Sequence, residues 1–276
     1  MLNCAITFIF TTLVSGVFGF YKRAFGLSFC CLLVSLLALY YCLFGSFQTL
    51  RFLPHHQSND QWTVVENNDF QTGGRSTMTL DEDDYSLDFT LQLTNDSPYP
   101  FAAAALVFQD QNRTPVLKDI SQFTDLHFRI RCVPTSVLSF SIFTVDQHIT
   151  NISDADTFRT PTHFFNCQDR WQEITIDMKH LETPQWWLDK YGVSLAERAY
   201  DLKKVRQLQF GSTHQTPTNV PTRIQINDLA LQGRSWHGFF VAIGAASLSW
   251  VLLIIWLFKA HKNALIADLK HKLQQE

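Results

Sequence analysis

Two stretches of this chain carry no charged side chain. Residues 236–258 and residues 24–47 contain no Asp, Glu, Lys or Arg. A helix of about 20 apolar residues is long enough to cross the hydrocarbon core of a bilayer. We therefore expect a transmembrane helix at each stretch, and any globular domain must come from the chain between them, residues 52–235.

The basic residues beside these stretches set the expected orientation. Lys22 and Arg23 precede the first stretch, and Lys259 and Lys262 follow the second. Lys and Arg near membrane helices favour the cytoplasmic side. The pattern predicts a multi-pass membrane protein, in contact with the lipid bilayer, with residues 52–235 outside the cytoplasm. In its general look the chain resembles a receptor of a bacterial inner membrane, which would put these residues in the periplasm.

Each end of the chain has two structural interpretations. Residues 1–20 are apolar and are expected to form a further transmembrane helix, because they lack the basic start and cleavage pattern of a signal peptide. An upstream extension from a misplaced start codon is the other interpretation. Residues 259–276 favour a cytoplasmic helical linker, in which Ile266, Leu269 and Leu273 have the three-then-four spacing of a coiled coil that would form a homodimer. The alternative is a basic amphipathic tail on the lipid surface.

Charge and cysteine content limit which functions the middle region can have and indicate its compartment. Residues 51–235 contain 23 acidic and 16 basic residues, a net charge of −7 without His. Nucleic-acid binding depends on Lys and Arg contacts to phosphate, so this class of function is excluded. Cys132 and Cys167 are the only cysteines of this region, and such a pair outside the cytoplasm is a disulfide candidate. Two buried thiols are the alternative.

The middle region is patterned as β-strands. In LHFRIRC (126–132) apolar and polar residues alternate with the period of a strand. Similar segments bounded by Pro, Gly, Asn and Asp predict a mostly β, two-sheet sandwich with one helical insert at 183–205; they are WTVVE (62–66), SLDFTLQL (86–93), AAAALVF (102–108), VLSFSIFTV (137–145), WQEITIDM (171–178), VRQLQFG (205–211) and TRIQINDLAL (222–231).

Three segments carry a family resemblance: DISQFTDLHFRIRC, DRWQEITIDMKHLETPQWW and VPTRIQINDLALQG. Over residues 62–232 the chain resembles the jelly-roll sandwiches of carbohydrate-binding modules and related galactose-binding-like domains. The resemblance implies an extracytoplasmic jelly roll, flanked here by transmembrane helices, that binds an oligosaccharide. Asn227 stands where the family often has Asp, so the structural calcium of such domains is not expected.

Four residues are candidates for ligand binding. Trp186 and Trp187 can stack on the apolar face of a sugar ring; the alternative places one in the core and the other at the edge of the sandwich. Arg129 and Arg131 share a strand face and can bind a polyhydroxyl or anionic ligand through their planar donor groups. Pairing with acids on a solvated sheet face is the alternative. Trp62 and Trp171 fit strand patterns and are expected in the core.

No catalytic, metal or cofactor motif is present. The histidines lack the spacing of zinc ligands, and there is no nucleophile elbow, phosphate loop or dinucleotide fingerprint. DEDD (81–84) lacks the spacing of a calcium loop and is expected to be an acidic turn. We expect no catalytic residues, no metal and no cofactor, and therefore not an enzyme.

The order of segments favours one function and leaves others open. It resembles the input half of bacterial transmembrane sensors, in which a periplasmic sandwich precedes a cytoplasmic output domain. The leading hypothesis is the input region of a signal-transduction receptor for a carbohydrate or another envelope ligand. The alternatives are a structural or interaction protein that docks another envelope protein, and an enzyme acting on envelope polysaccharide.

Overall fold

The computed structural model describes residues 23–54, 61–81 and 85–274, without the side chains of 268–273. The chain divides into two compact units. One comprises Gln48–Arg234, and the other comprises Met1–Phe47 with Ser235–Glu276. The predicted helix at 1–20 and most of the acidic segment 81–84 lie outside the described residues.

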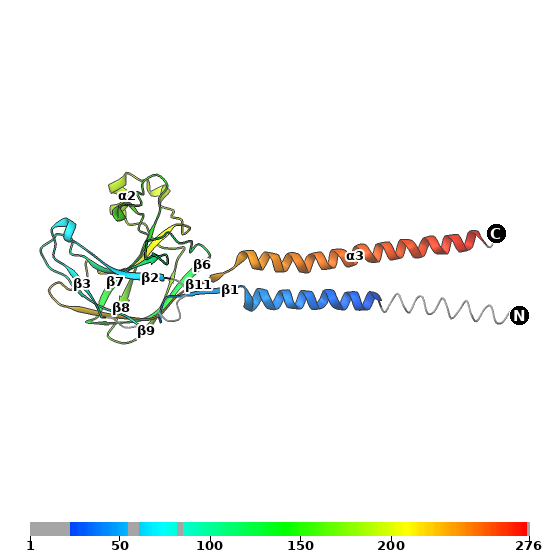
Figure 1. Ribbon diagram of the computed structural model, residues 1–276, viewed down its shortest axis with the longest axis horizontal. Coiled ribbons are helices and arrows are strands. Elements are labelled where there is room, and N and C mark those ends of the chain that lie inside the picture. Colours follow the sequence, from blue (N-terminus) through cyan, green and yellow to red (C-terminus); the bar gives the residue numbers. More distant parts are fainter. Residues whose placement is uncertain (1–22, 55–60, 82–84, 275–276) are drawn as a thin grey trace. The chain divides into compact units, whose positions relative to one another are not determined.

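The unit Gln48–Arg234 is a sandwich of two antiparallel sheets (Figure 1). The six-stranded sheet has the order β3 (Thr77–Asp81), β4 (Leu87–Gln92), β11 (Thr222–Arg234), β6 (Phe123–Val133) and β9 (Gln172–Asp177), with β1 (Phe47–Arg51) also paired to β11. The five-stranded sheet has the order β2 (Gln61–Asn68), β5 (Ala102–Gln109), β10 (Val205–Gly211), β7 (Ser136–Thr144) and β8 (Thr162–Cys167). The expected mostly β, two-sheet sandwich is confirmed.

The alternation of β6 explains how the sheets pack. Leu126, Phe128 and Ile130 point inward and are at most 2% exposed, whereas the residues between them face outward. Phe128 meets Phe210 of the opposite sheet edge to face, with ring centroids 5.3 Å apart. Burial of apolar area of this kind is the main favourable term in folding. The outward residues of β6 are therefore free to serve as binding groups.

Strand boundaries differ from the sequence predictions at several places. β1, β3 and β8 were not predicted, and β1 begins at Phe47, the last residue of the expected membrane helix. The expected helical insert holds one short helix, α2 (Gln185–Tyr191), and a 3-10 turn, η5 (Leu195–Glu197). Short or irregular strands give too few periods for a sequence pattern to show them.

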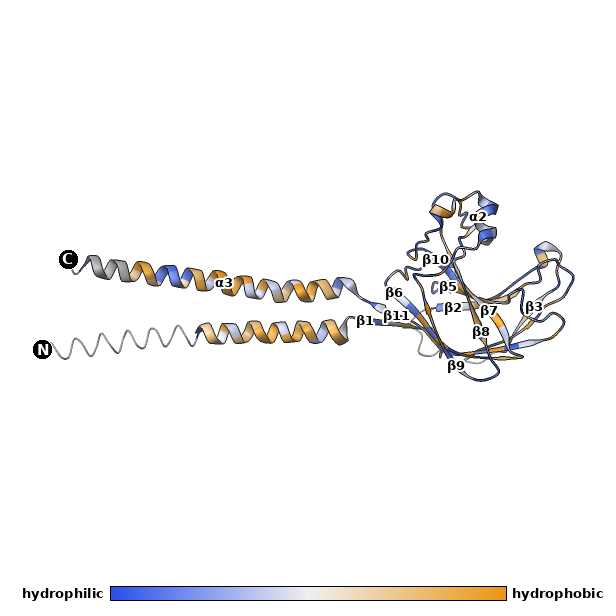
Figure 2. Ribbon diagram, turned by 180° about the vertical axis from the view of Figure 1, so that it is seen from behind, coloured by the Kyte–Doolittle hydropathy of each residue, from blue (hydrophilic) through white to orange (hydrophobic). Residues whose placement is uncertain are grey.

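Two helices make up the described part of the other unit. The N-terminal helix, Arg23–Gly45, and α3, Trp236–Leu273, each contain a span long and apolar enough to cross a membrane, judged by length and composition. Figure 2 shows apolar residues along the N-terminal helix and the first part of α3. The indole Nε1 of Trp250 donates to Ser35 Oγ at 2.9 Å, so the two helices contact each other. The homodimer contact expected from Leu269 and Leu273 stays a prediction, because their side chains lie outside the described part.

Candidate ligand-binding site

The two neighbouring tryptophans of α2 have opposite surroundings. Trp187 is 0% exposed, whereas Trp186 is 56% exposed. Trp187 packs between Tyr191, with ring centroids 5.0 Å apart, and the guanidinium of Arg159. The expectation that Trp187 binds a sugar is wrong, because its ring has no accessible face. Of the two α2 tryptophans, Trp186 is the one that offers a surface for stacking.

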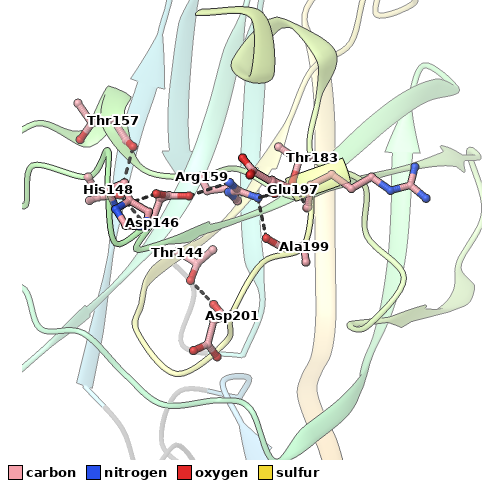
Figure 3. A network of polar contacts seen from close by, with 11 residues as sticks. Thr144, Asp146, His148, Thr157, Arg159, Thr183, Glu197, Ala199 and Asp201 are labelled. Atoms are coloured by element: carbon pink, nitrogen blue, oxygen red, sulfur yellow. Dashed lines mark hydrogen bonds and ion pairs between the residues drawn. The ribbon is translucent and has the colours of Figure 1, made fainter. Parts of the chain in front are cut away.

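Arg159 joins the insert to the sandwich. Its Nη1 donates to the carbonyl oxygens of Glu197 at 2.8 Å and Ala199 at 2.6 Å, and its Nη2 donates to Asp146 Oδ2 at 2.7 Å (Figure 3). The Arg159 side chain is 6% exposed and that of Asp146 is 12% exposed. A buried charge requires such pairing and hydrogen bonding. These polar groups therefore have a structural role and are not available to a ligand.

Arg129 and Arg131 both lie on the outer face of the six-stranded sheet, as their alternation predicts. Arg131 donates to Asp169 Oδ1 from Nε at 3.0 Å and from Nη2 at 2.8 Å, so it is paired with an acid. Arg129 lies 3.7 Å from Asp228 and 5.8 Å from the ring of Trp171. Trp171 is 38% exposed, which corrects its expected place in the core.

A groove of about 350 Å³ opens on this outer face, between β1, β6, β9 and β11. Its floor follows from the strand register, in which His127 lies between Ala230 of β11 and Thr175 of β9. Ala230, which has a small side chain, lies at the groove. The groove is lined by Thr49, Arg51, Leu53, His127, Phe128, Arg129, Glu173, Ile174, Thr175, Asp228, Ala230 and Gln232.

The polar groups of the groove are held by neighbouring strands. His127 Nδ1 and Thr175 Oγ1 are 2.8 Å apart, which fixes the imidazole and leaves Nε2 as its other hydrogen-bonding atom. Glu173 lies opposite Arg129 in the strand register. Asp228 reaches Arg129 from a bulge of β11 in which its backbone has φ 53°. The arrangement presents carboxylate, guanidinium, imidazole, amide and hydroxyl groups in one open site.

Cys132 of β6 and Cys167 of β8 form a disulfide between the two sheets, with sulfur atoms 2.00 Å apart. Both residues are fully buried. The bond fixes β6, which supplies His127 and Arg129 to the groove, against the five-stranded sheet.

The residues that the structure describes contain no cluster of three or more His, Cys, Asp or Glu side chains suited to hold a metal ion. Asn227, which stands where the carbohydrate-binding modules often have Asp, lies in β11 beside the bulge that presents Asp228. Its Oδ1 is buried and has no hydrogen-bond partner among the described residues.

Of the residues that line the groove, only Arg129 is predicted from the sequence as a ligand-binding residue. The alternation of β6 and β9 places His127, Glu173 and Thr175 outward, and a pairing of these two strands would have brought them together. Asp228 gave no such signal, because an insertion in a strand shifts every later side chain to the other face.

No family model and no curated protein matches the chain. Several solved structures are similar at low identity. The family 11 carbohydrate-binding module of Clostridium thermocellum, in complex with a beta-1,3-1,4-mixed-linked tetrasaccharide, is 11% identical, with 67% of this chain and 96% of that chain covered and a TM-score of 0.45. A family 30 carbohydrate-binding module is 14% identical, with 68% and 88% covered and a TM-score of 0.44. A family 29 module is 12% identical, with 67% and 87% covered and a TM-score of 0.36. Similarities this low say nothing about the ligand of this chain.

Proposed function

We propose that this protein is a membrane-anchored binding protein whose β-sandwich holds a carbohydrate in the groove on the six-stranded sheet. The observation that carries this proposal is the groove itself. Its open volume of about 350 Å³ is bordered by several kinds of hydrogen-bonding side chain, and Arg129 at its edge lies 5.8 Å from the ring of the half-exposed Trp171.

The chemistry of these groups suits a polyhydroxylated ligand. Each sugar hydroxyl both donates and accepts, and the groove offers both kinds of partner. Glu173 and Asp228 accept, Arg129 donates, and the Gln232 amide does both. The flat indole of Trp171 presents an apolar surface for the C–H face of a sugar ring.

In this proposal the two apolar helices anchor the sandwich in a membrane, and the sandwich lies outside the cytoplasm; the basic residues beyond the helices support this orientation under the positive-inside rule. A disulfide at Cys132 and Cys167 suits an oxidising compartment such as the periplasm. In this proposal the chain is the input region of a signal-transduction receptor. A homodimer through 259–276 would carry the signal onward.

The test is a panel of neutral and charged oligosaccharides added to the full chain in detergent micelles, with thermal stabilisation of the sandwich as the readout. His127→Ala is expected to abolish the shift given by a binding sugar, because His127 lines the groove. Trp171→Ala is expected to weaken the shift, because this indole lies beside Arg129 at the groove edge. Trp186→Ala is the matched comparison, because this indole is exposed on α2 and does not line the groove.

Loss of binding in Trp186→Ala alone would move the site to the insert. If no sugar of the panel stabilises the protein, carbohydrate binding is refuted. Docking of another envelope protein through the sandwich would then be the better hypothesis.

A further inference from the structure

Glu173 differs from the other charged groups of the groove. Among the residues that the structure describes, its carboxylate has no ion-pair or hydrogen-bond partner. Arg129, directly opposite in the strand register, is already engaged by Asp228 at 3.7 Å and by the ring of Trp171 at 5.8 Å. An ionised carboxylate is an acceptor only, so Glu173 remains available to a donor brought by a ligand.

The acidic residues beside the groove favour a cationic donor. The charges of the lining residues themselves cancel, with Arg51 and Arg129 against Glu173 and Asp228. Two further acids, Asp125 and Asp177, lie opposite each other on β6 and β9, one step along the same face from His127 and Thr175. Hydrogen bonds from the backbone N–H of Lys179 and from His180 lower the pKa of Asp177, so this carboxylate stays ionised.

The domain as a whole also carries an excess of negative charge. Residues 51–235 carry 23 acidic and 16 basic residues. A surface with an excess of negative charge attracts cations and repels anionic ligands. Polyuronates and phosphorylated sugars are therefore disfavoured.

Building on the proposed function, we propose that the carbohydrate in this groove carries a protonated amino group, as glucosamine-type sugars do, and that the ammonium binds Glu173. An ammonium group presents three donors, which match the free oxygens of the carboxylate. Ring hydroxyls then bind the His127–Thr175 pair in the groove. One ring face meets Trp171, which lies beside Arg129 at the groove edge.

The test compares three tetrasaccharides of equal length: one of glucosamine, one of N-acetylglucosamine and one of galacturonate. Binding to the full chain in detergent micelles is measured by titration calorimetry at about pH 6, where an amine is protonated and a carboxylate is ionised. The glucosamine tetramer is expected to bind about tenfold more tightly than the N-acetylated one, with the difference shrinking as salt is added.

Glu173→Gln is expected to remove this preference while leaving the melting temperature unchanged, because Glu173 is exposed and unpartnered. Asp169→Asn is the matched control, since it neutralises an acid that pairs with Arg131 outside the groove.

Equal affinity for the glucosamine and N-acetylglucosamine tetramers, lost in His127→Ala, would overturn the amino-sugar inference and leave the proposed carbohydrate site standing. A preference for galacturonate, or a glucosamine preference that survives Glu173→Gln, would also overturn it. Absence of binding by all three tetramers and by the neutral panel overturns both.

Discussion

The guanidinium carbon of Arg159 lies 4.8 Å from the centroid of the Trp187 ring, and both side chains are buried. This contact decides the role of both residues. Arg159 binds carbonyl oxygens of the insert and a carboxylate of the sandwich at once, and Trp187 covers its face. The contact makes the insert a structural extension of the domain.

Arg159→Leu is expected to lower the free energy of unfolding of the sandwich by about 3–5 kcal/mol, because removing one partner leaves the buried Asp146 carboxylate unpaired. Denaturant unfolding followed by near-UV circular dichroism measures the change. Arg198→Leu, at an exposed position of the same insert, is the control and should stay within about 0.5 kcal/mol of the wild type. Equal effects of the two substitutions would contradict the role assigned to Arg159.

Two arginines of the outer sheet face should differ in their contribution to stability. Arg223 donates to both oxygens of Asp88, a carboxylate that is 5% exposed, at 3.0 and 2.6 Å. Arg223→Met is expected to destabilise the fold more than Arg131→Met, because it leaves the buried Asp88 carboxylate without its two-point partner. Arg131→Met breaks an exposed pair with Asp169 and is expected to cost at most about 1 kcal/mol. The same denaturant assay shows which substitution lowers the free energy of unfolding more. A larger loss for Arg131→Met would show that burial of the carboxylate does not determine the strength of these ion pairs.

Asp177 gives a prediction about acid stability. The backbone N–H of Lys179 and then the His180 side chain lower the pKa of this carboxyl below its usual 3.8. A carboxyl with a lower pKa in the folded state adds stability above its unfolded pKa, and this stability is lost as the pH falls through the folded pKa. Asp177→Asn should therefore be less stable than the wild type near neutral pH, with the difference disappearing in acid.

Unfolding curves at several pH values test this behaviour of Asp177. An NMR titration of the carboxyl group should also give a midpoint below 3.8. A stability difference that stays constant down to the acid range would mean that the carboxylate charge is not involved.

The disulfide can be tested by thiol labelling. In the denatured, unreduced chain, Cys132 and Cys167 should resist alkylation, whereas Cys30, Cys31 and Cys42 should react. Replacing both bonded cysteines by Ala is expected to cost about 2–4 kcal/mol, the usual contribution of a disulfide. Labelling of all these positions before reduction would show that the bond does not form in the protein.

The strand pattern predicted much of the sandwich, because the inward and outward residues of a long strand alternate with a period of two. β6 and β11 are long and regular enough to show it, and the outward position of Arg129 followed directly. Trp171 was misplaced because it precedes β9, where no inward partner covers it. The pattern of a single strand cannot show which strand lies beside it.

Local residue patterns were enough to predict the two uncharged apolar stretches, the mostly β domain between them and the faces of its long strands, because each is a property of neighbouring residues. Three relationships became visible once the chain was folded: Trp187 is buried against Arg159, Cys132 is bonded to Cys167, and His127, Glu173 and Asp228 share one groove. Those relationships depend on strand order, register and one bulge, which arise from contacts between residues far apart in the chain.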